Sequence, residues 1–262
     1  SNFLLSQKIN KGDRIGMISN NSYEWATLAY ATYMIGGVFV PMYQNQLIEE
    51  CNYIVNNSDI KILFCNNFKK YKSCVNNIDS KNLDNVFFFD HQDHPQNAYN
   101  HINNKKNILD SNLYNRINEN DIANIIYTSG TTGKPKGVVN THKNIISNIK
   151  MIKESFDDFN HICNMNDKSV SFLPWAHCYG QTCELNGLIS TGGSTYISES
   201  IEKLPKELNI IKPTLLYSVP ALFTNIYKGV ESKFDKPILK HVFEDAIDSY
   251  DKKDTISNFK NK

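Results

Sequence analysis

The feature of this sequence that most constrains its fold is a loop rich in glycines and hydroxyl-bearing residues. Residues 127–137 read YTSGTTGKPKG and continue the apolar run ANIIYT at 123–128. Four hydroxyls, three glycines and two lysines occupy the ten residues 128–137, where a buried strand is expected to end. Glycines allow positive φ and close backbone approach, while N–H groups, hydroxyls and lysines bind phosphate oxygens. The pattern predicts a triphosphate-binding loop; a solvated turn between two strands is the alternative.

The loop differs from the two best-known nucleotide-binding motifs. A Walker A motif needs a glycine, four residues, and then Gly-Lys followed by Ser or Thr. Here Gly133-Lys134 is followed by Pro135. The GxGxxG fingerprint of dinucleotide-binding folds is also absent from the sequence. The loop therefore matches neither of these two motifs.

Short apolar runs alternate with amphipathic segments along the chain. Strands are expected at 14–19, 38–42, 61–65, 86–90, 123–128, 170–174, 194–198 and 214–219. Helices are expected at 22–34, 46–57 and 141–156, with Ser22 and Thr141 as N-caps. Gly36 and Gly37 are expected to form a turn. This alternation predicts an α/β fold with mainly parallel sheets covered by helices on both faces.

Two polar segments lack this pattern. Residues 91–107 are polar and unperiodic, which predicts a flexible surface loop. Residues 231–262 become increasingly charged, and we expect a helix or a tail there.

Composition excludes several classes of protein. The 262 residues contain 28 Lys+Arg and 27 Asp+Glu, a net charge of +1, so no nucleic-acid partner is expected. No apolar stretch reaches 18 residues, so no transmembrane helix is predicted. The six cysteines contain no CxxC pair, which favours reduced thiols in an intracellular protein. Cys178 and Cys183, five residues apart on an expected helix, are assigned to packing.

The string YTSGTTGKPKGV resembles the phosphate-binding signature of the AMP-forming acyl-adenylate synthetase superfamily, which includes acyl-CoA synthetases, nonribosomal adenylation domains and luciferases. Three further blocks resemble the family in the expected order: residues 21–65, 173–185 (LPWAHCYGQTCEL) and 212–230 (KPTLLYSVPALFTNIYKGV). The last two look most like long-chain fatty acyl-CoA synthetases. The resemblance covers nearly the whole chain apart from 91–107, and it implies the fold of the family's large N-terminal domain.

The resemblance also implies roles for individual residues. The residues that would contact the β- and γ-phosphates of ATP are Thr128, Ser129, Gly130, Thr131, Thr132, Gly133, Lys134 and Lys136. Thr128 would in addition ligate Mg²⁺. His177 would orient the carboxylate and adenylate, a structural histidine being the alternative. Trp175 and Tyr179 would line or gate an acyl tunnel or pack as core aromatics, and Tyr217 and Pro220 would lie beside the adenine or the acyl group.

By this resemblance the protein is a long-chain fatty acid–CoA ligase that uses ATP, Mg²⁺ and CoA. The alternatives are a ligase for an aromatic or short-chain acid, and a non-catalytic relative that binds nucleotide or acyl groups. The family's magnesium-binding Glu, ribose-binding Asp, hinge and small C-terminal domain find no match. We therefore expect residues 1–262 to form a partial N-terminal AMP-binding domain that is inactive alone. A cytoplasmic location, or peripheral attachment to an internal membrane, fits a lipid substrate.

Overall fold

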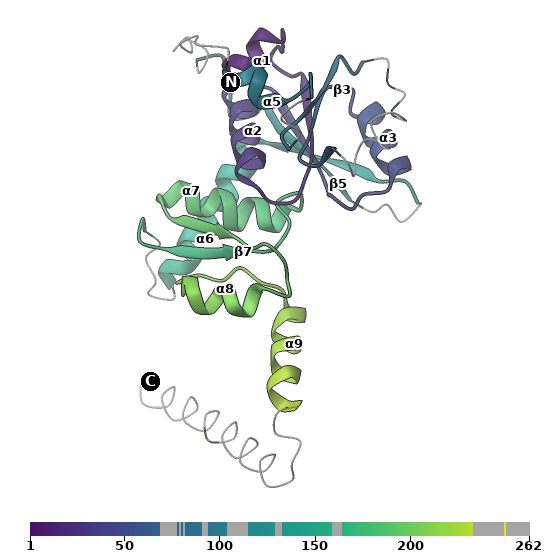
Figure 1. Cartoon of the computed structure of the whole chain (residues 1–262). Coiled ribbons are helices and arrows are strands. Elements are labelled where there is room, and N and C mark those ends of the chain that lie inside the picture. Colours follow the sequence, from purple (N-terminus) through teal and green to yellow (C-terminus); the bar gives the residue numbers. More distant parts are fainter. Residues whose placement is uncertain are drawn as a thin grey trace. The chain divides into compact units, whose positions relative to one another are not determined.

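The computed structural model describes residues 1–68, 78, 80, 82–90, 94–103, 115–128, 133–158, 164–232 and 249 (Figure 1). The chain divides into two compact units, Ser1–Tyr217 and Ser218–Lys262. Both sheets lie in the first unit, and helix α9 (Pro220–Glu231) lies in the second.

A six-stranded sheet forms the centre of the first unit, with strand order β4-β3-β1-β2-β5-β6. Its strands are β1 (Arg14–Ile18), β2 (Val38–Met42), β3 (Ile60–Cys65), β4 (Asn85–Phe88), β5 (Ile122–Thr128) and β6 (Lys136–Thr141). Strands β1 to β5 run parallel, and β6 runs antiparallel to β5. The mainly parallel sheet is confirmed, whereas β6 was not among the expected strands.

Helices cover both faces of this sheet in the part of the chain that the structure describes. On one face, α1 (Asn2–Ser6), α2 (Tyr23–Met34) and α5 (Ala98–Asn103) contribute to a core cluster with Ile62 and Phe64. On the other face, α3 (Ile48–Asn57) packs in a second cluster with Leu63 and Cys65. Successive residues of β3 serve opposite clusters because strand side chains alternate between the two faces of a sheet.

The two predicted N-caps and the glycine turn are confirmed. The Ser22 side chain accepts the backbone N–H of Trp25 at the start of α2. The Thr141 hydroxyl accepts the Asn144 N–H (3.2 Å) at the start of α6 (His142–Asp158). Gly36 has φ +71°, a left-handed conformation that glycine adopts without a steric penalty. Local sequence chemistry therefore sets where these elements begin and end.

A two-stranded parallel sheet, β7 (Lys168–Ser171) and β8 (Ser194–Ile197), completes the first unit. Between its strands lie the π-helix η2 (Gly180–Asn186) and helix α7 (Gly187–Thr191), and α8 (Leu204–Ile211) follows β8. Trp175, on the loop before η2, belongs to the first core cluster, with its ring 5.6 Å from that of Trp25. This contact joins the segment after β7 to helix α2.

Two expectations are wrong. Within 91–107, residues 98–103 form helix α5, because Asn97 accepts the Asn100 N–H (3.2 Å) as a cap and Ala98 is fully buried. Residues 91–93 and 104–107 lie outside the described residues. The expected strand at 214–219 does not form: Thr214 and Leu215 both donate to the Lys168 carbonyl (2.9 and 3.1 Å), whereas a ladder needs successive partners.

The predicted helix or tail at 231–262 falls almost entirely outside the described residues, which there are only 231, 232 and 249. Among the described residues, no helix has the length and apolar character needed to cross a bilayer.

Candidate functional site

The glycine-rich loop is the turn of a β-hairpin. Strand β5 ends at Thr128 and β6 begins at Lys136, and these two exposed residues pair across the antiparallel ladder. Gly133 and Lys134 lie on the arm that leads into β6. The remaining predicted phosphate contacts, Ser129, Gly130, Thr131 and Thr132, lie outside the described residues and stay predictions. The structure thus brings Thr128 and Lys136 together at the base of the loop.

Two glycines of the hairpin serve different physical purposes. Gly133 has φ +92°, and a Cβ built there would meet nothing within 4 Å, so the backbone conformation and not the space favours glycine. A Cβ at Gly137 would lie 2.9 Å from an Ile125 methyl and 3.0 Å from the Tyr127 ring. Gly137 therefore lets β6 pack closely against the side chains of β5.

The two lysines of the loop have different surroundings. The Lys134 ammonium lies 5.7 Å from the ring centroid of Tyr53 on α3, within the range of a cation–π contact. The Tyr53 ring packs edge-on against Tyr127 of β5 (6.5 Å). Lys136 is exposed at the start of β6, opposite Thr128. The loop thus carries one lysine that lies over an aromatic ring and one that faces solvent.

His177 is exposed on the turn between β7 and η2. Its Nδ1 lies 3.2 Å from the backbone N–H of Tyr179, which donates to it. Because Nδ1 acts as the acceptor, the neutral ring carries its proton on Nε2. His177 therefore has an N–H donor suited to an anionic oxygen such as that of a carboxylate.

A cavity of about 290 Å³ lies between β5, α6 and η2. Its lining includes Asn124, Ile126, Tyr179, Gln181, Thr182 and Cys183. The Asn124 Nδ2 group donates to Gln181 Oε1 (2.7 Å), and each of these side chains is only 1% exposed. This buried bond ties the strand that precedes the glycine-rich loop to the helix that follows the His177 turn. Two segments predicted separately from the sequence therefore meet at one place.

The structure separates the two aromatic residues considered for an acyl tunnel. Trp175 is 1% exposed and packs in the core against Trp25, which favours the core alternative. Tyr179 is 38% exposed and lines the 290 Å³ cavity. Of the two, Tyr179 is the one that lines a cavity and is open to solvent.

The thiol of Cys183 is half-buried beside that of Cys178. Burial, and secondarily the nearby Cys178, raises the pKa of the Cys183 thiol. A raised pKa disfavours the reactive thiolate. In the described part of the chain, no three His, Cys, Asp or Glu side chains converge as a metal site.

Tyr217 and Pro220 lie in different units of the chain. Tyr217 is buried at the end of the first unit, where it lines a small cavity with Ile149 and Leu188. Pro220 begins α9 in the second unit. Their predicted contacts with adenine or acyl groups stay predictions.

A buried carboxyl group that sequence reasoning missed anchors η2. Glu184 is 1% exposed, and its two oxygens accept the hydroxyls of Ser169 (2.8 Å) and Ser171 (2.7 Å) from β7. Burial raises the pKa of this carboxyl. The signal in the sequence is the pair of serines at alternate positions of KSVSF, which places two hydroxyls on one face of a buried strand.

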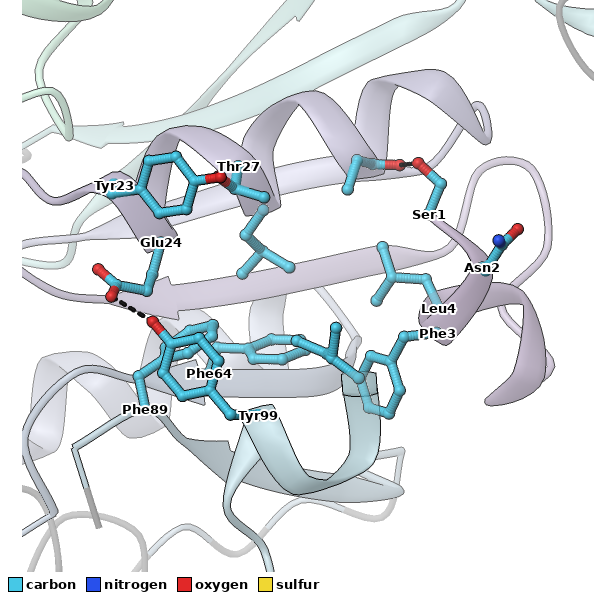
Figure 2. Close-up of a pocket in the computed structure, with 13 residues that line it drawn as sticks. Ser1, Asn2, Phe3, Leu4, Tyr23, Glu24, Thr27, Phe64, Phe89 and Tyr99 are labelled. Atoms are coloured by element: carbon cyan, nitrogen blue, oxygen red, sulfur yellow. Dashed lines mark hydrogen bonds between the residues drawn. The ribbon is translucent and has the colours of Figure 1, made fainter. Parts of the chain in front are cut away.

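A second cavity, of about 420 Å³, lies along α1 and α2 (Figure 2). Its apolar lining includes Phe3, Leu28, Phe64 and Phe89, and a hydrogen bond from Tyr99 to Glu24 crosses one end. Burial and this hydrogen bond raise the pKa of Tyr99 to about 12. No residue assigned by resemblance lines this cavity, so it is separate from the candidate site.

Known proteins resemble this chain in sequence. Long-chain-fatty-acid–CoA ligase 5 of Rattus norvegicus is 28% identical over 251 residues, which cover 89% of this chain and 36% of the relative. Long chain acyl-CoA synthetase 7, peroxisomal, of Arabidopsis thaliana is 30% identical over 268 residues, covering 97% of this chain and 37% of the relative. The chain therefore spans a little over a third of the length of these relatives.

Solved structures share its fold. ATP-bound MatB from Rhodopseudomonas palustris matches with a TM-score of 0.70 at 23% identity, over 92% of this chain and 45% of that protein. A long-chain-fatty-acid–CoA ligase from Archaeoglobus fulgidus matches with a TM-score of 0.72 at 21% identity, over 88% of this chain and 44% of that protein. At these identities the likeness concerns the fold alone.

The sequence model of one family, described as "AMP-binding enzyme", matches residues 1–252. The match includes the hairpin, the His177 turn and both sheets. Its extent, together with the ordered blocks and the shared fold, places the chain in the AMP-binding enzyme family.

Proposed function

We propose that the protein is an AMP-forming ligase that activates a long-chain fatty acid with ATP and transfers the acyl group to CoA. The buried Asn124–Gln181 bond carries this proposal, because it joins the phosphate-loop strand to the segment bearing His177. The names of the rat and Arabidopsis relatives support the long-chain substrate.

In the first half-reaction, a carboxylate oxygen of the acid attacks the α-phosphorus of ATP in line. The bond from that phosphorus to the pyrophosphate oxygen breaks, which gives acyl-AMP and pyrophosphate. Such a reaction needs positioning and neutralisation of developing charge more than covalent chemistry. The hairpin residues Thr128, Gly133, Lys134 and Lys136, with Ser129, Gly130, Thr131 and Thr132, would hold the β- and γ-phosphates.

The Thr128 hydroxyl fits a role as one ligand of Mg²⁺. It is exposed at the end of β5, opposite Lys136, and magnesium in nucleotide sites takes few protein ligands and several phosphate or water oxygens. The ion, when bound, would neutralise charge on the departing pyrophosphate.

His177 would donate its Nε2 proton in a hydrogen bond to the carboxylate and then to the acyl-adenylate. The cavity lined by Tyr179 lies directly after this turn and would receive part of the acyl group. In the second half-reaction, the CoA sulfur attacks the acyl carbon, the bond to the AMP oxygen breaks, and acyl-CoA and AMP leave.

The proposal is tested by measuring pyrophosphate release from the purified protein at its native length. Palmitate, hexanoate and benzoate are compared, each with ATP and Mg²⁺, and acyl-CoA is then measured after adding CoA. We expect release to depend on palmitate. A preference for hexanoate or benzoate would instead favour the short-chain or aromatic ligase, and ATP binding without release from any acid would favour the non-catalytic relative.

A further inference from the structure

The side chain of Asn21 spans from the six-stranded sheet to the segment that precedes His177. Asn21 lies on the loop between β1 and α2, at the carboxyl edge of the parallel strands. Its Nδ2 group donates to Ser171 Oγ (2.9 Å) and to the Leu173 carbonyl (2.8 Å). Its Oδ1 accepts the backbone N–H of Trp175 (2.8 Å). One side-chain amide therefore forms hydrogen bonds with three residues of the segment 171–175, which begins 150 positions later in the sequence.

Hydrogen bonds and packing fix both flanks of the His177 turn, and the bonds of Asn21 act on the flank before it. On the side before the turn, Trp175 is also fixed by burial of its ring against Trp25. On the side after it, the His177 carbonyl accepts the Gln181 N–H (3.0 Å) as η2 begins. The Ser171 hydroxyl that accepts from Asn21 donates to Glu184 of η2 (2.7 Å). A hydrogen-bonded chain thus runs from Asn21 through Ser171 to Glu184.

The chemistry of the contact requires an amide. Two acceptors face the Nδ2 end and one N–H donor faces the Oδ1 end, and a carboxamide offers donors and an acceptor on one short side chain. Aspartate would keep the acceptor for Trp175 but would place negative charge against the Leu173 carbonyl. Alanine would remove the acceptor of the Trp175 N–H and the donor to the Leu173 carbonyl, and Ser171 would keep only its bond to Glu184.

We propose that Asn21 is a positioning residue for His177: it holds the His177 turn at the carboxyl edge of the six-stranded sheet, where Nε2 meets the carboxylate of the acid. The part of this inference that concerns the acid rests on the proposed function. Ligands of open parallel sheets bind at this edge, so the position of the turn matters to any substrate held there.

The first test measures backbone hydrogen exchange over residues 172–179 in the native-length protein. We expect the Trp175 amide to exchange at least ten-fold faster in Asn21→Ala, and also in Asn21→Leu, which serves if the alanine variant does not fold, because neither side chain offers an acceptor to the Trp175 N–H. The matched control is Asn20→Ala, which removes the adjacent, exposed asparagine and should leave exchange unchanged. Unchanged exchange in the Asn21 variants would overturn the inference.

The second test is a double-mutant cycle with His177→Ala, measured as acid-dependent adenylation. Asn21→Ala should lower kcat/KM for the acid roughly ten-fold, leave the KM for ATP within about two-fold, and have no further effect in the His177→Ala background, because coupled residues are not additive. Additive losses, or an equal effect on ATP, would show a merely structural role and overturn the inference.

The two tests separate failure of this inference from failure of the proposed function. A wild-type protein that forms no acyl-adenylate from any acid overturns the ligase proposal. The exchange measurement still decides whether Asn21 holds the His177 turn, because it needs no turnover.

Discussion

Lys134 and Lys136 are two residues apart in the sequence, yet the structure gives them different surroundings. The Lys134 ammonium lies over the Tyr53 ring, and this cation–π contact attracts its charge towards the ring. Lys136 is exposed at the base of the hairpin and pairs with Thr128. We therefore assign to Lys136 the larger share of the charge that would meet the phosphates.

Replacing Lys136 with Ala should reduce adenylation by the native-length enzyme by roughly 10²-fold or more, the scale of losing one preorganised charge-stabilising contact. Thr132→Val, within the loop, is expected to act similarly. Pyrophosphate release measures both. Lys150→Ala, on the exposed face of α6, is the control and should leave the rate unchanged. Full activity of Lys136→Ala would refute the assigned role.

At the scale of elements, η2 is the irregular one. π-helical turns are rare and occur mostly at functional sites. Here η2 begins at Gly180, where a Cβ would lie 2.7 Å from the Pro174 carbonyl oxygen and 3.1 Å from that of Leu173. Both obstacles are backbone atoms of the segment held by Asn21. The first turn of η2 can therefore contact that segment only because residue 180 has no side chain.

Gly180→Ala should destabilise the protein by about 1–3 kcal/mol, the usual cost of overpacking a close contact. The midpoint of denaturant unfolding measures this. Gly229→Ala, on α9, meets nothing within 4 Å and is the matched control. It should be neutral or stabilising by about 0.5–1 kcal/mol, since alanine favours helices over glycine. Equal stability of the two variants would contradict the close packing of η2.

The pH dependence of the free energy of unfolding is a property of the whole molecule, because it reflects the difference in proton binding between the folded and unfolded states. Burial raises the folded-state pKa of Glu184 above its usual value of 4.5. The folded protein therefore holds this proton more tightly than the unfolded chain does. The stabilisation of the folded state by the Glu184 proton is therefore complete below pH 4.5. It is lost as the pH rises through the raised folded-state pKa.

Glu184→Gln should remove this dependence. The free energy of unfolding of the wild type, minus that of the variant, should fall as the pH rises from about 4.5 towards neutrality. Denaturant unfolding at a series of pH values measures it, with Glu154→Gln on exposed α6 as the control. A difference that stays flat, or that grows with pH, would contradict the raised pKa.

Much of the fold was predictable from local signals. The strands and helices from residue 14 to residue 65 match their expected positions, because apolar runs, the Ser22 cap and the glycine turn act within a few residues. Helix α5 was missed because it is only six residues long and depends on burial of Ala98. The strand expected at 214–219 does not form, because the N–H groups of Thr214 and Leu215 both donate to the Lys168 carbonyl.

In the candidate site too, some features are encoded locally in the sequence and others depend on long-range contacts. The sequence by itself determined the glycine-rich loop and the family, because the glycines, hydroxyls and lysines lie within one short segment, whereas strand β6 of the hairpin was not predicted. Only the tertiary structure decided that Asn21, Ser171 and Glu184 form one hydrogen-bonded chain around His177, and that Trp175 is buried while Tyr179 is exposed. Those outcomes depend on contacts between residues up to 154 positions apart, which no local pattern encodes.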